Sequence, residues 1–353
     1  MTPTSAASAA PLPAPETGPT AGPTAGPTAG TAGPTDGPPA APSLSRGVRA
    51  LRAVAIASCL PYITLKVLWI AGNRVGVPDD STLLDDRIAM AFANSVSVVL
   101  DAAVVVLALL LTRPWGRRVP AWLLGLPMWA AAGLLAPIMT GYPLQLAGAL
   151  ADGSRPAPSN SEPFLDAWVF AVVYSGFILQ GLTLGALFVR YARRRWGHLW
   201  RGPLGDPRTT TVARATAAAG ALLALLPGVM HLLWATGATT GLSADRIAER
   251  STDFYLVEGV HALFAVVAVA GTLLLALPFR AAGRLSPRIP LATAWVGSGT
   301  LGCWGGFLFL TTLLPTDPDQ RAAGPMVLTY AVSMVAGFLL FGSVVSTLRR
   351  RAV

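Results

Sequence analysis

Charged residues are scarce in this chain of 353 residues, of which only 12% are Asp, Glu, Lys or Arg. A typical soluble domain has about 25%. Because 12% cannot cover the surface of a soluble protein of this length, we exclude a soluble multidomain fold. Hydrophobic residues make up 53% of the chain, and the mean hydropathy is +0.56. The composition predicts a polytopic membrane protein.

Cysteine is also nearly absent, since the chain has only Cys59 and Cys303. Two cysteines exclude a disulfide scaffold and every Cys-rich zinc or iron–sulfur module. No Walker A, G-x-S-x-G, H-E-x-x-H or G-x-G-x-x-G pattern occurs in the strand–helix context that would give it meaning. Polar residues within the apolar runs are therefore the main guide to function.

Residues 1–45 differ in composition from the rest of the chain. They are rich in Pro, Gly, Ala and Thr, and the sequence Gly-Pro-Thr-Ala recurs from Gly18 onward. Proline removes backbone donors and the segment has few bulky apolar groups to bury. We predict a disordered cytoplasmic tail without a stable fold of its own.

From Arg46 onward, long apolar runs alternate with short polar segments. A helix needs about 20 residues to cross a hydrocarbon core about 30 Å thick. Because unpaired amides find no partner in lipid, we expect an all-α bundle of transmembrane helices. We expect Pro127 and Pro137 to interrupt the third span. The eight predicted spans are 50–72, 90–112, 120–140, 164–189, 215–236, 254–279, 290–313 and 325–347.

Most of the 26 basic residues lie in one set of loops and tails, and most acids lie in the opposite set. Because cytoplasmic loops retain positive charge, we place both termini in the cytoplasm of a multi-pass protein of the plasma membrane. The net charge of the chain is +9. We expect this excess positive charge to lie on the cytoplasmic side, next to anionic lipid headgroups. The lipid bilayer is the expected partner, and nucleic acid is not.

Three landmarks occur twice in the same order, about 165 positions apart. They are W-x-x-G-x-x-x-G motifs at Trp69 and Trp234, glycine pairs that begin at Gly176 and Gly337, and Leu-Leu-Leu runs before Pro114 and Pro278. We predict two tandem four-helix repeats in the same orientation, 46–195 and 215–353, joined by a basic cytoplasmic linker, 196–214. Transporters built from parallel repeats place their sites at the interface of the halves. The motif Gly302-x-x-x-Gly306 predicts close helix packing.

Five ionisable side chains lie inside predicted spans: Lys66, Asp101, His231, Glu258 and His261. Such residues are costly in hydrocarbon and are candidates for function. At 1.5 Å per residue, Asp101 lies about 16 Å below the outer end of its span, near the midplane. The other four lie about 6–10 Å below the outer ends. Glu258 and His261 are three positions apart and share one helix face.

When the two repeats are aligned in sequence, Lys66 corresponds to His231. In the same alignment, Asn94 and Ser97 correspond to Glu258 and His261. All these positions are polar in segments that are otherwise mostly aliphatic. We therefore expect a polar chamber in the outer leaflet, opened between the two halves.

His231, Glu258 and His261 offer two imidazoles and a carboxylate, which are ligands typical of zinc and non-haem iron. Other interpretations stay open. Glu258 and a histidine can shuttle a proton, or the cluster can bind the polar head of a lipid-like solute. The cluster can also be an interhelical hydrogen-bond network, Lys66 can extend to the membrane surface, and Asp101 can be a packing carboxyl or a proton relay.

The stretch Pro61-Tyr-x-x-x-Lys66-x-x-Trp69-x-x-Gly72, together with the arginine-dominated composition, resembles polytopic membrane proteins of uncharacterised function from high-GC actinobacteria. The resemblance implies no activity and no site residue.

The leading expectation for function is a permease or binder for a small amphipathic or apolar solute, with the polar cluster as its site. The second is a membrane-embedded enzyme that uses Glu258 as an acid or base, or His231, Glu258 and His261 as ligands of zinc or iron. The third is an accessory subunit whose glycine faces dock a partner, with oligomerisation as one form of this.

Overall fold

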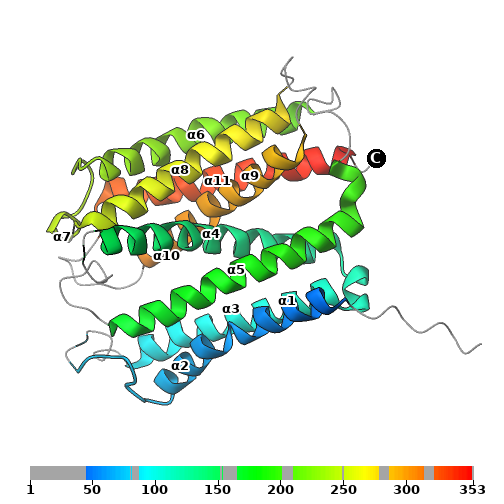
Figure 1. Ribbon diagram of the computed structural model, residues 1–353. Helices are drawn as coiled ribbons and strands as arrows, with labels where there is room; N and C mark the ends of the chain where they lie inside the picture. Colours follow the sequence, from blue (N-terminus) through cyan, green and yellow to red (C-terminus); the bar gives the residue numbers. More distant parts are fainter. Residues whose placement is uncertain are drawn as a thin grey trace, which may run out of the picture. The chain divides into compact units, whose positions relative to one another are not determined.

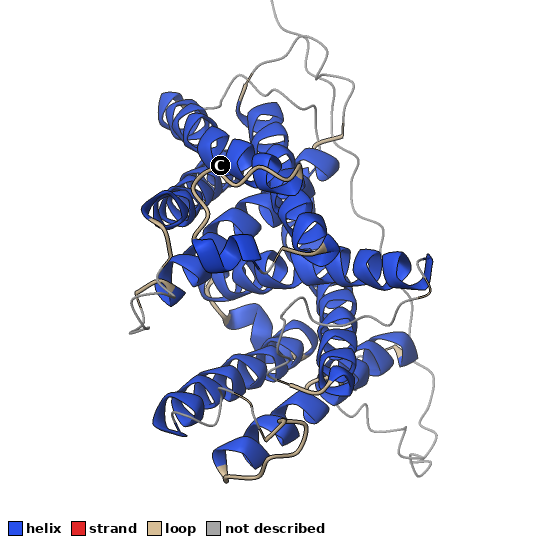
Figure 2. Cartoon of the chain, turned by 90° about the vertical axis from the view of Figure 1, so that its left-hand side faces the viewer, coloured by secondary structure: helices blue, strands red, loops and turns tan. Residues whose placement is uncertain are grey.

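The computed structural model describes residues 45–79, 81, 87–151, 153, 165–200, 210–248, 250–277, 286–313 and 322–351. Every regular element within these ranges is a helix, as Figures 1 and 2 show. The all-α prediction is confirmed for this part of the chain. The tail expected to be disordered, 1–45, lies outside the described residues except for Ser45. The helices all belong to one unit, Leu44–Val353.

Seven helices are long and apolar enough to cross a membrane. The first consists of two segments, α1 (Arg46–Ala57) and α2 (Leu60–Ile70). The others are α3 (Arg87–Thr112), α4 (Ala121–Ala151), α5 (Ala167–Trp196), α6 (Thr211–Ala235), α8 (Thr252–Ala276) and α11 (Gly324–Arg351). The 3₁₀ helices η2 (Pro114–Arg118) and η3 (Gly197–Trp200) and the short α7 (Ala244–Ala248) lie between them. A polytopic membrane protein accounts for these lengths and compositions.

The segment predicted as the span 290–313 consists of three consecutive elements. They are α9 (Arg288–Gly299), the π-helical turn η5 (Thr300–Trp304) and α10 (Gly305–Thr311). None of them alone has the length of a membrane span, so the expected count of eight is not confirmed. The segment is rich in glycine and packs against α4, α8 and α11. Its neighbours are therefore largely other helices of the same chain.

The outer faces of the long helices are apolar. Ile88 on α3, Leu222 on α6 and Ile289 on α9 are 83%, 69% and 72% exposed. Polar residues such as Gln180 and Thr272 are instead buried, at 1% and 0% exposure. This inversion is what a lipid environment favours, because hydrocarbon accepts apolar surface and rejects unpaired polar groups.

α4 continues through Pro127, Pro137 and Pro143 as one helix. The expectation that prolines interrupt the third span is therefore wrong. Proline has no N–H, so each one leaves the carbonyl four residues earlier without its helical donor. For Pro137 that carbonyl belongs to Gly133, and the hydroxyl of Thr300 on η5 donates to it at 3.2 Å. A side chain from a neighbouring helix thus supplies the donor that the proline lacks.

Two further hydrogen bonds join α4 to this segment. The indole N–H of Trp129 donates to Ser298 Oγ at 3.1 Å, and that of Trp304 donates to the Leu134 carbonyl at 3.0 Å. The two helices approach so closely at Gly133 that an added Cβ would lie 2.2 Å from the carbonyl carbon of Gly299. α4 therefore fixes the position of the π-helical turn.

Gly302 takes part in the same packing. An added Cβ there would lie 2.8 Å from the Trp129 ring, and one at Gly337 would lie 2.1 Å from the Gly302 nitrogen. The close packing expected at Gly302 is confirmed. The close neighbours of Gly306 are atoms of Met334, at 3.4 Å and more. Gly302 contacts helices of its own chain, so it does not offer a face to an outside partner.

The W-x-x-G-x-x-x-G motif at the end of α2 forms a compact turn. Gly72 has a φ of 89°, and the Gly72 and Asn73 amides donate to the carbonyls of Trp69 and Leu68 at 3.0 and 2.9 Å. This pattern is the Schellman motif, which needs a residue with positive φ. The Trp69 indole N–H then donates to the Val75 carbonyl at 2.8 Å.

The second motif, at the end of α6, forms the same turn. Gly237 has a φ of 96°, and the Gly237 and Ala238 amides donate to the carbonyls of Trp234 and Leu233 at 3.1 and 2.9 Å. The Trp234 indole N–H donates to the Thr240 carbonyl at 2.9 Å. The motif is thus repeated in structure as well as in sequence at this point of the chain.

The helices form two groups. In the first, α5 contacts α1, α2 and α3, and α3 contacts α1 and α2. In the second, α6 contacts α8 and α11, and α9 contacts α8 and α11. α4 belongs to the first half of the sequence but contacts α8, α9 and η5 as well as α5. Figure 1 shows α4 between the two groups.

Candidate functional site

The candidate site lies between α6 and α8, which pack against each other. His231 lies one turn before the end of α6, and Glu258 and His261 lie one turn apart in α8. α8 begins at a definite residue, because its N-cap Ser251 accepts a hydrogen bond from the Phe254 amide. The C-terminal end of α6 and the N-terminal end of α8 thus place the three side chains at the same depth in the helix bundle.

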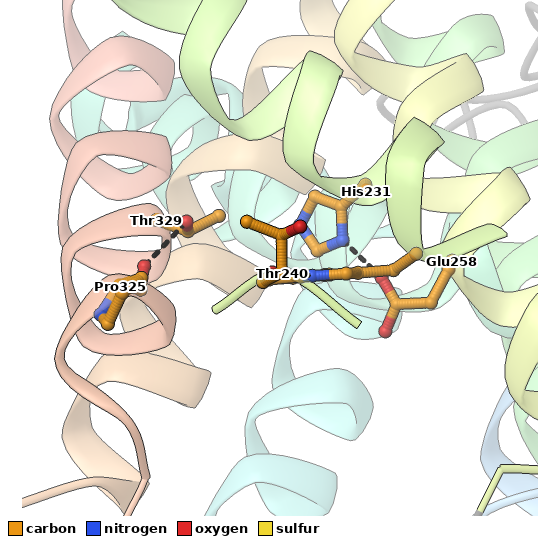
Figure 3. A network of polar contacts seen from close by, with 6 residues as sticks. His231, Thr240, Glu258, Pro325 and Thr329 are labelled. Atoms are coloured by element: carbon orange, nitrogen blue, oxygen red, sulfur yellow. Dashed lines mark hydrogen bonds and ion pairs between the residues drawn. The ribbon is translucent and has the colours of Figure 1, made fainter. Parts of the chain in front are cut away.

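His231 and Glu258 form a buried pair. The Nδ1 atom of His231 is hydrogen-bonded to Oε2 of Glu258, as Figure 3 shows. The two residues are only 5% and 8% exposed. Because a buried carboxylate needs a hydrogen-bond partner, His231 satisfies Glu258. Nε2 is then the nitrogen of His231 that stays available to a ligand.

His261 is the less satisfied member of the cluster. Its ring centroid lies 5.0 Å from that of His231, with 37° between the ring planes. Both ring nitrogens of His261 are buried and have no hydrogen-bond partner among the described residues. An unpaired buried donor or acceptor costs about 1–3 kcal/mol. A native protein accepts such a cost mainly where a bound water, an ion or another ligand satisfies the group.

A small cavity lies beside the two imidazoles. Helices α6, α8 and α11 and the segment η5–α10 surround it. Its volume is about 10 Å³, about the space needed for the centre of one water molecule. The lining residues are Pro227, His231, His261, Ala265, Thr300, Leu301, Trp304, Gly305, Leu308, Tyr330 and Ser333. Glu258 is not among them, so it lies behind His231.

Aromatic rings enclose the histidines. The ring of His231 lies 5.2 Å from that of Trp234 and 6.5 Å from that of Tyr330, and the ring of His261 lies 5.9 Å from that of Trp304. The side chain of Arg246, on α7, hydrogen-bonds to Tyr330 and lies close enough to Glu258 for their charges to attract. The histidines therefore lie in aromatic surroundings, with an arginine near Glu258 and Tyr330.

The three side chains form a plausible ligand set for a metal ion. One donor atom from each of His231, Glu258 and His261 lies within 4.8 Å of the other two. Zinc binds imidazole nitrogen at about 2.0–2.1 Å and carboxylate oxygen at about 2.0–2.2 Å. Donor atoms around one ion are then about 3.3 Å apart, so the three side chains would have to rotate slightly toward one another to hold an ion.

The structure does not bring the other predicted residues to this cavity. Lys66 lies on α2, and Asn94 and Ser97 lie on α3, whereas the cavity is lined by α6, α8, η5, α10 and α11. The chamber expected between the two halves is thus replaced by a cavity within the second group of helices. Asp101 is buried on α3, where it pairs with Gln180 rather than with a histidine.

Several residues of the site are not evident from the sequence. Tyr330 and Ser333 are polar residues within the last span, but nothing in their spacing points to His231. Outside this site, Gln180 lies within the glycine pair that begins at Gly176, and its side-chain amide donates to Asp101. A buried amide in a membrane helix is a usable signal, because such groups need partners.

Searches against protein-family models, curated proteins and solved structures find no match to this chain. The resemblance to actinobacterial membrane proteins therefore stays a prediction. The case for the site depends on its geometry alone.

Proposed function

We propose that this chain is a multi-pass permease for a divalent transition-metal ion, with Zn²⁺ as the favoured ion. The observation that carries the proposal is the convergence of His231, Glu258 and His261 within 4.8 Å, with both nitrogens of His261 left unpartnered. Ionisable residues inside a membrane are costly and typically mark ion pathways. Imidazole nitrogens suit zinc better than calcium or magnesium, which prefer oxygen ligands.

The proposal includes the membrane arrangement expected from the sequence. We place the protein in the plasma membrane with both termini in the cytoplasm, because arginine clusters form the last turns of α5 and α11. We count α9, η5 and α10 together as the seventh of eight spans, since these elements follow one another without a break. The identical turns after α2 and α6 support the two four-helix repeats.

The size of the cavity favours an ion over an amphipathic solute. At about 10 Å³ it holds an ion or one water, whereas pockets for organic ligands measure about 300–1,000 Å³. A metalloenzyme also needs an open coordination position and room for its substrate. The lining of the cavity is aromatic and small, so a bound ion fits and a substrate does not.

Glu258 acts on the ion mainly through His231. Its carboxylate holds Nδ1, and this orients Nε2 toward the cavity. Carboxylate–histidine–metal arrangements of this kind fix the tautomer of the ligand and raise its basicity. The negative charge also offsets part of the charge of the ion. We therefore assign Glu258 as a positioning residue and His231 and His261 as ligands.

Metal content of the purified protein tests this assignment. After purification in detergent without chelator and dialysis against Zn²⁺, we expect one zinc per chain by elemental analysis. His231→Ala and His261→Ala each remove the zinc. The matched control is His198→Ala, because the chain has three histidines and His198 is exposed on η3. Retention of zinc by both cavity variants would rule out the site.

Glu258→Gln separates a ligand from a positioning residue. Loss of the hydrogen-bond partner of a metal ligand typically lowers metal affinity by about 10–100-fold. We expect Glu258→Gln to keep one zinc per chain at saturation but to release it at a lower chelator concentration. In proteoliposomes, Zn²⁺ uptake should fall in Glu258→Gln and in both histidine variants of the cavity, and it should persist in His198→Ala. Zinc binding without any uptake would limit the protein to a binder.

A further inference from the structure

The first group of helices has its own buried polar network, centred on Asp101. Asp101 is only 4% exposed and lies in the middle of α3. The side-chain amide of Gln180, on α5, donates to its Oδ1 at 3.0 Å. The same amide nitrogen lies 3.4 Å from the sulfur of Cys59, at the junction between α1 and α2. Three segments of the chain therefore meet at this carboxyl group.

The second oxygen of Asp101 has no hydrogen-bond partner. Oδ2 is buried and unpartnered among the described residues. The charged and titratable groups that face it are Lys66 and Tyr62 from α2 and Cys59 from the α1–α2 junction. The neighbour from α5, Gln180, is uncharged. No cation within the described ranges lies within 4.0 Å of the carboxylate.

Lys66 is held away from Asp101 by two aromatic rings. Its Nζ lies 4.8 Å from the centroid of the Tyr62 ring and 4.7 Å from that of the Trp69 ring. Cation–π contacts of this kind stabilise a desolvated ammonium by about 2 kcal/mol. The Lys66 side chain has a flexible four-carbon stem, so its ammonium group can leave the two rings and pair with a nearby carboxylate.

The helix beside Asp101 is distorted. α1 ends at Ala57 and α2 begins at Leu60, with Pro61 in its first turn. Because Pro61 has no N–H, the carbonyl of Ala57 lacks its helical donor. Irregular backbone at membrane depth is tolerated where it lines a polar or water-filled site. The junction thus adds an acceptor to a region that already contains a buried acid.

We propose that Asp101 is a proton-binding site and that the ammonium of Lys66 replaces the proton when it leaves. We assign the arrangement in the structure, where Oδ2 is buried without a partner, to neutral Asp101 with the proton on Oδ2. An ionised carboxylate with one hydrogen bond is too costly in this surrounding. In the alternative arrangement, the O–H bond of Asp101 breaks, the proton passes to water, and Lys66 leaves the rings to pair with the carboxylate. The Asp101–Lys66 pair carries one positive charge with the proton bound and none after the proton has left, when the ammonium neutralises the carboxylate.

This inference does not depend on zinc binding, because no residue of the network lines the histidine cavity. It concerns the first group of helices and gives the protein a second functional centre. If both proposals hold, the first group binds protons and the second binds the metal ion.

Infrared difference spectroscopy of the protein in lipid nanodiscs tests the proposal. We expect the C=O stretch of a protonated, weakly hydrogen-bonded carboxyl at neutral pH, which disappears as the pH rises. Asp101→Asn should remove this band. The control Asp79→Asn should keep it, because the Asp79 side chain is 96% exposed. A band that persists in Asp101→Asn, or a wild type without a pH-dependent band, would overturn the assignment.

Two further variants keep Asp101 and test its partners. Lys66→Met removes the cation that replaces the proton. The carboxyl band should then persist to a pH about one unit higher or more, because a charge–charge contact that favours the carboxylate is lost. Gln180→Leu removes the hydrogen bond to Oδ1, so the band should move to a higher wavenumber. Spectra identical to wild type in both variants would contradict the proposed exchange, even if Asp101→Asn fails to fold.

Discussion

The two groups of helices end their first spans with the same turn but hold different polar groups beneath it. After α2 and after α6, a glycine with positive φ closes a Schellman motif and a tryptophan indole caps the loop. Beneath the first turn lies Lys66, between two aromatic rings. Beneath the second lies His231, bonded to Glu258. The two turns have the same geometry, and the polar groups below them differ.

Backbone geometry explains why the two turns are alike. A Schellman motif needs positive φ, and the indole bond needs a carbonyl at a fixed distance along the loop. Side chains inside a helix bundle have no such constraint, provided that each polar group finds a partner. Lys66 and His231 can therefore differ while Gly72 and Gly237 cannot.

The third elements of the two groups differ in another way. α4 is a continuous helix with three internal prolines, whereas the corresponding segment of the second group contains the π-helical turn η5. Wide turns of this type are frequent at functional sites. The turn contributes Thr300, Leu301 and Trp304 to the wall of the histidine cavity. The group with the π turn is thus the group with the cavity.

Gly133→Ala should have the largest effect on stability, because it acts where the two groups meet. The added Cβ would lie 2.2 Å from the Gly299 carbonyl carbon. Such overpacking typically costs about 1–3 kcal/mol. The control is Gly141→Ala in the same helix, which has open space around the new methyl group. We expect the free energy of unfolding, measured by SDS titration, to fall only in Gly133→Ala; equal values for the two variants would argue against this contact.

Gly72→Ala and Gly237→Ala test the equivalence of the two turns. Both glycines have positive φ, at 89° and 96°, and an alanine in a left-handed conformation costs about 1–2 kcal/mol. We expect similar losses of unfolding free energy in the two variants. Gly148→Ala is a suitable control, because Gly148 lies within α4 with open space around it. A loss at only one turn would contradict the structural repeat.

The sequence predicts much of the fold, because its signals are local. Apolar runs gave helices near the predicted positions, and the three-residue spacing of Glu258 and His261 placed them on one face of α8. The convergence with His231 followed from depth along two helices. The Trp69 and Trp234 motifs predicted a recurring feature, and both form the same turn.

The remaining features depend on contacts between distant segments. Pro137 predicts a broken helix unless Thr300 is known to donate to the Gly133 carbonyl. The π turn at Thr300–Trp304 has no local signal apart from its glycines. The direction of Lys66 depends on where the rings of Tyr62 and Trp69 lie. The sequence therefore indicates which residues lie at the same depth in the membrane. Which of these side chains contact one another depends on how the helices pack.

The smallest expected effect comes from Trp69→Phe and Trp234→Phe, which sharpen the comparison. Each variant loses an indole bond to a carbonyl six residues later, at 2.8 and 2.9 Å, and a hydrogen bond contributes about 0.5–1.5 kcal/mol. If the turns are equivalent, the two losses of unfolding free energy agree within about 0.5 kcal/mol. Zinc affinity separates the positions, because the Trp234 ring lies 5.2 Å from that of His231, whereas Trp69 faces Lys66. We expect zinc binding, measured by chelator competition, to weaken in Trp234→Phe alone; an equal change in Trp69→Phe would mean that the two groups share one site.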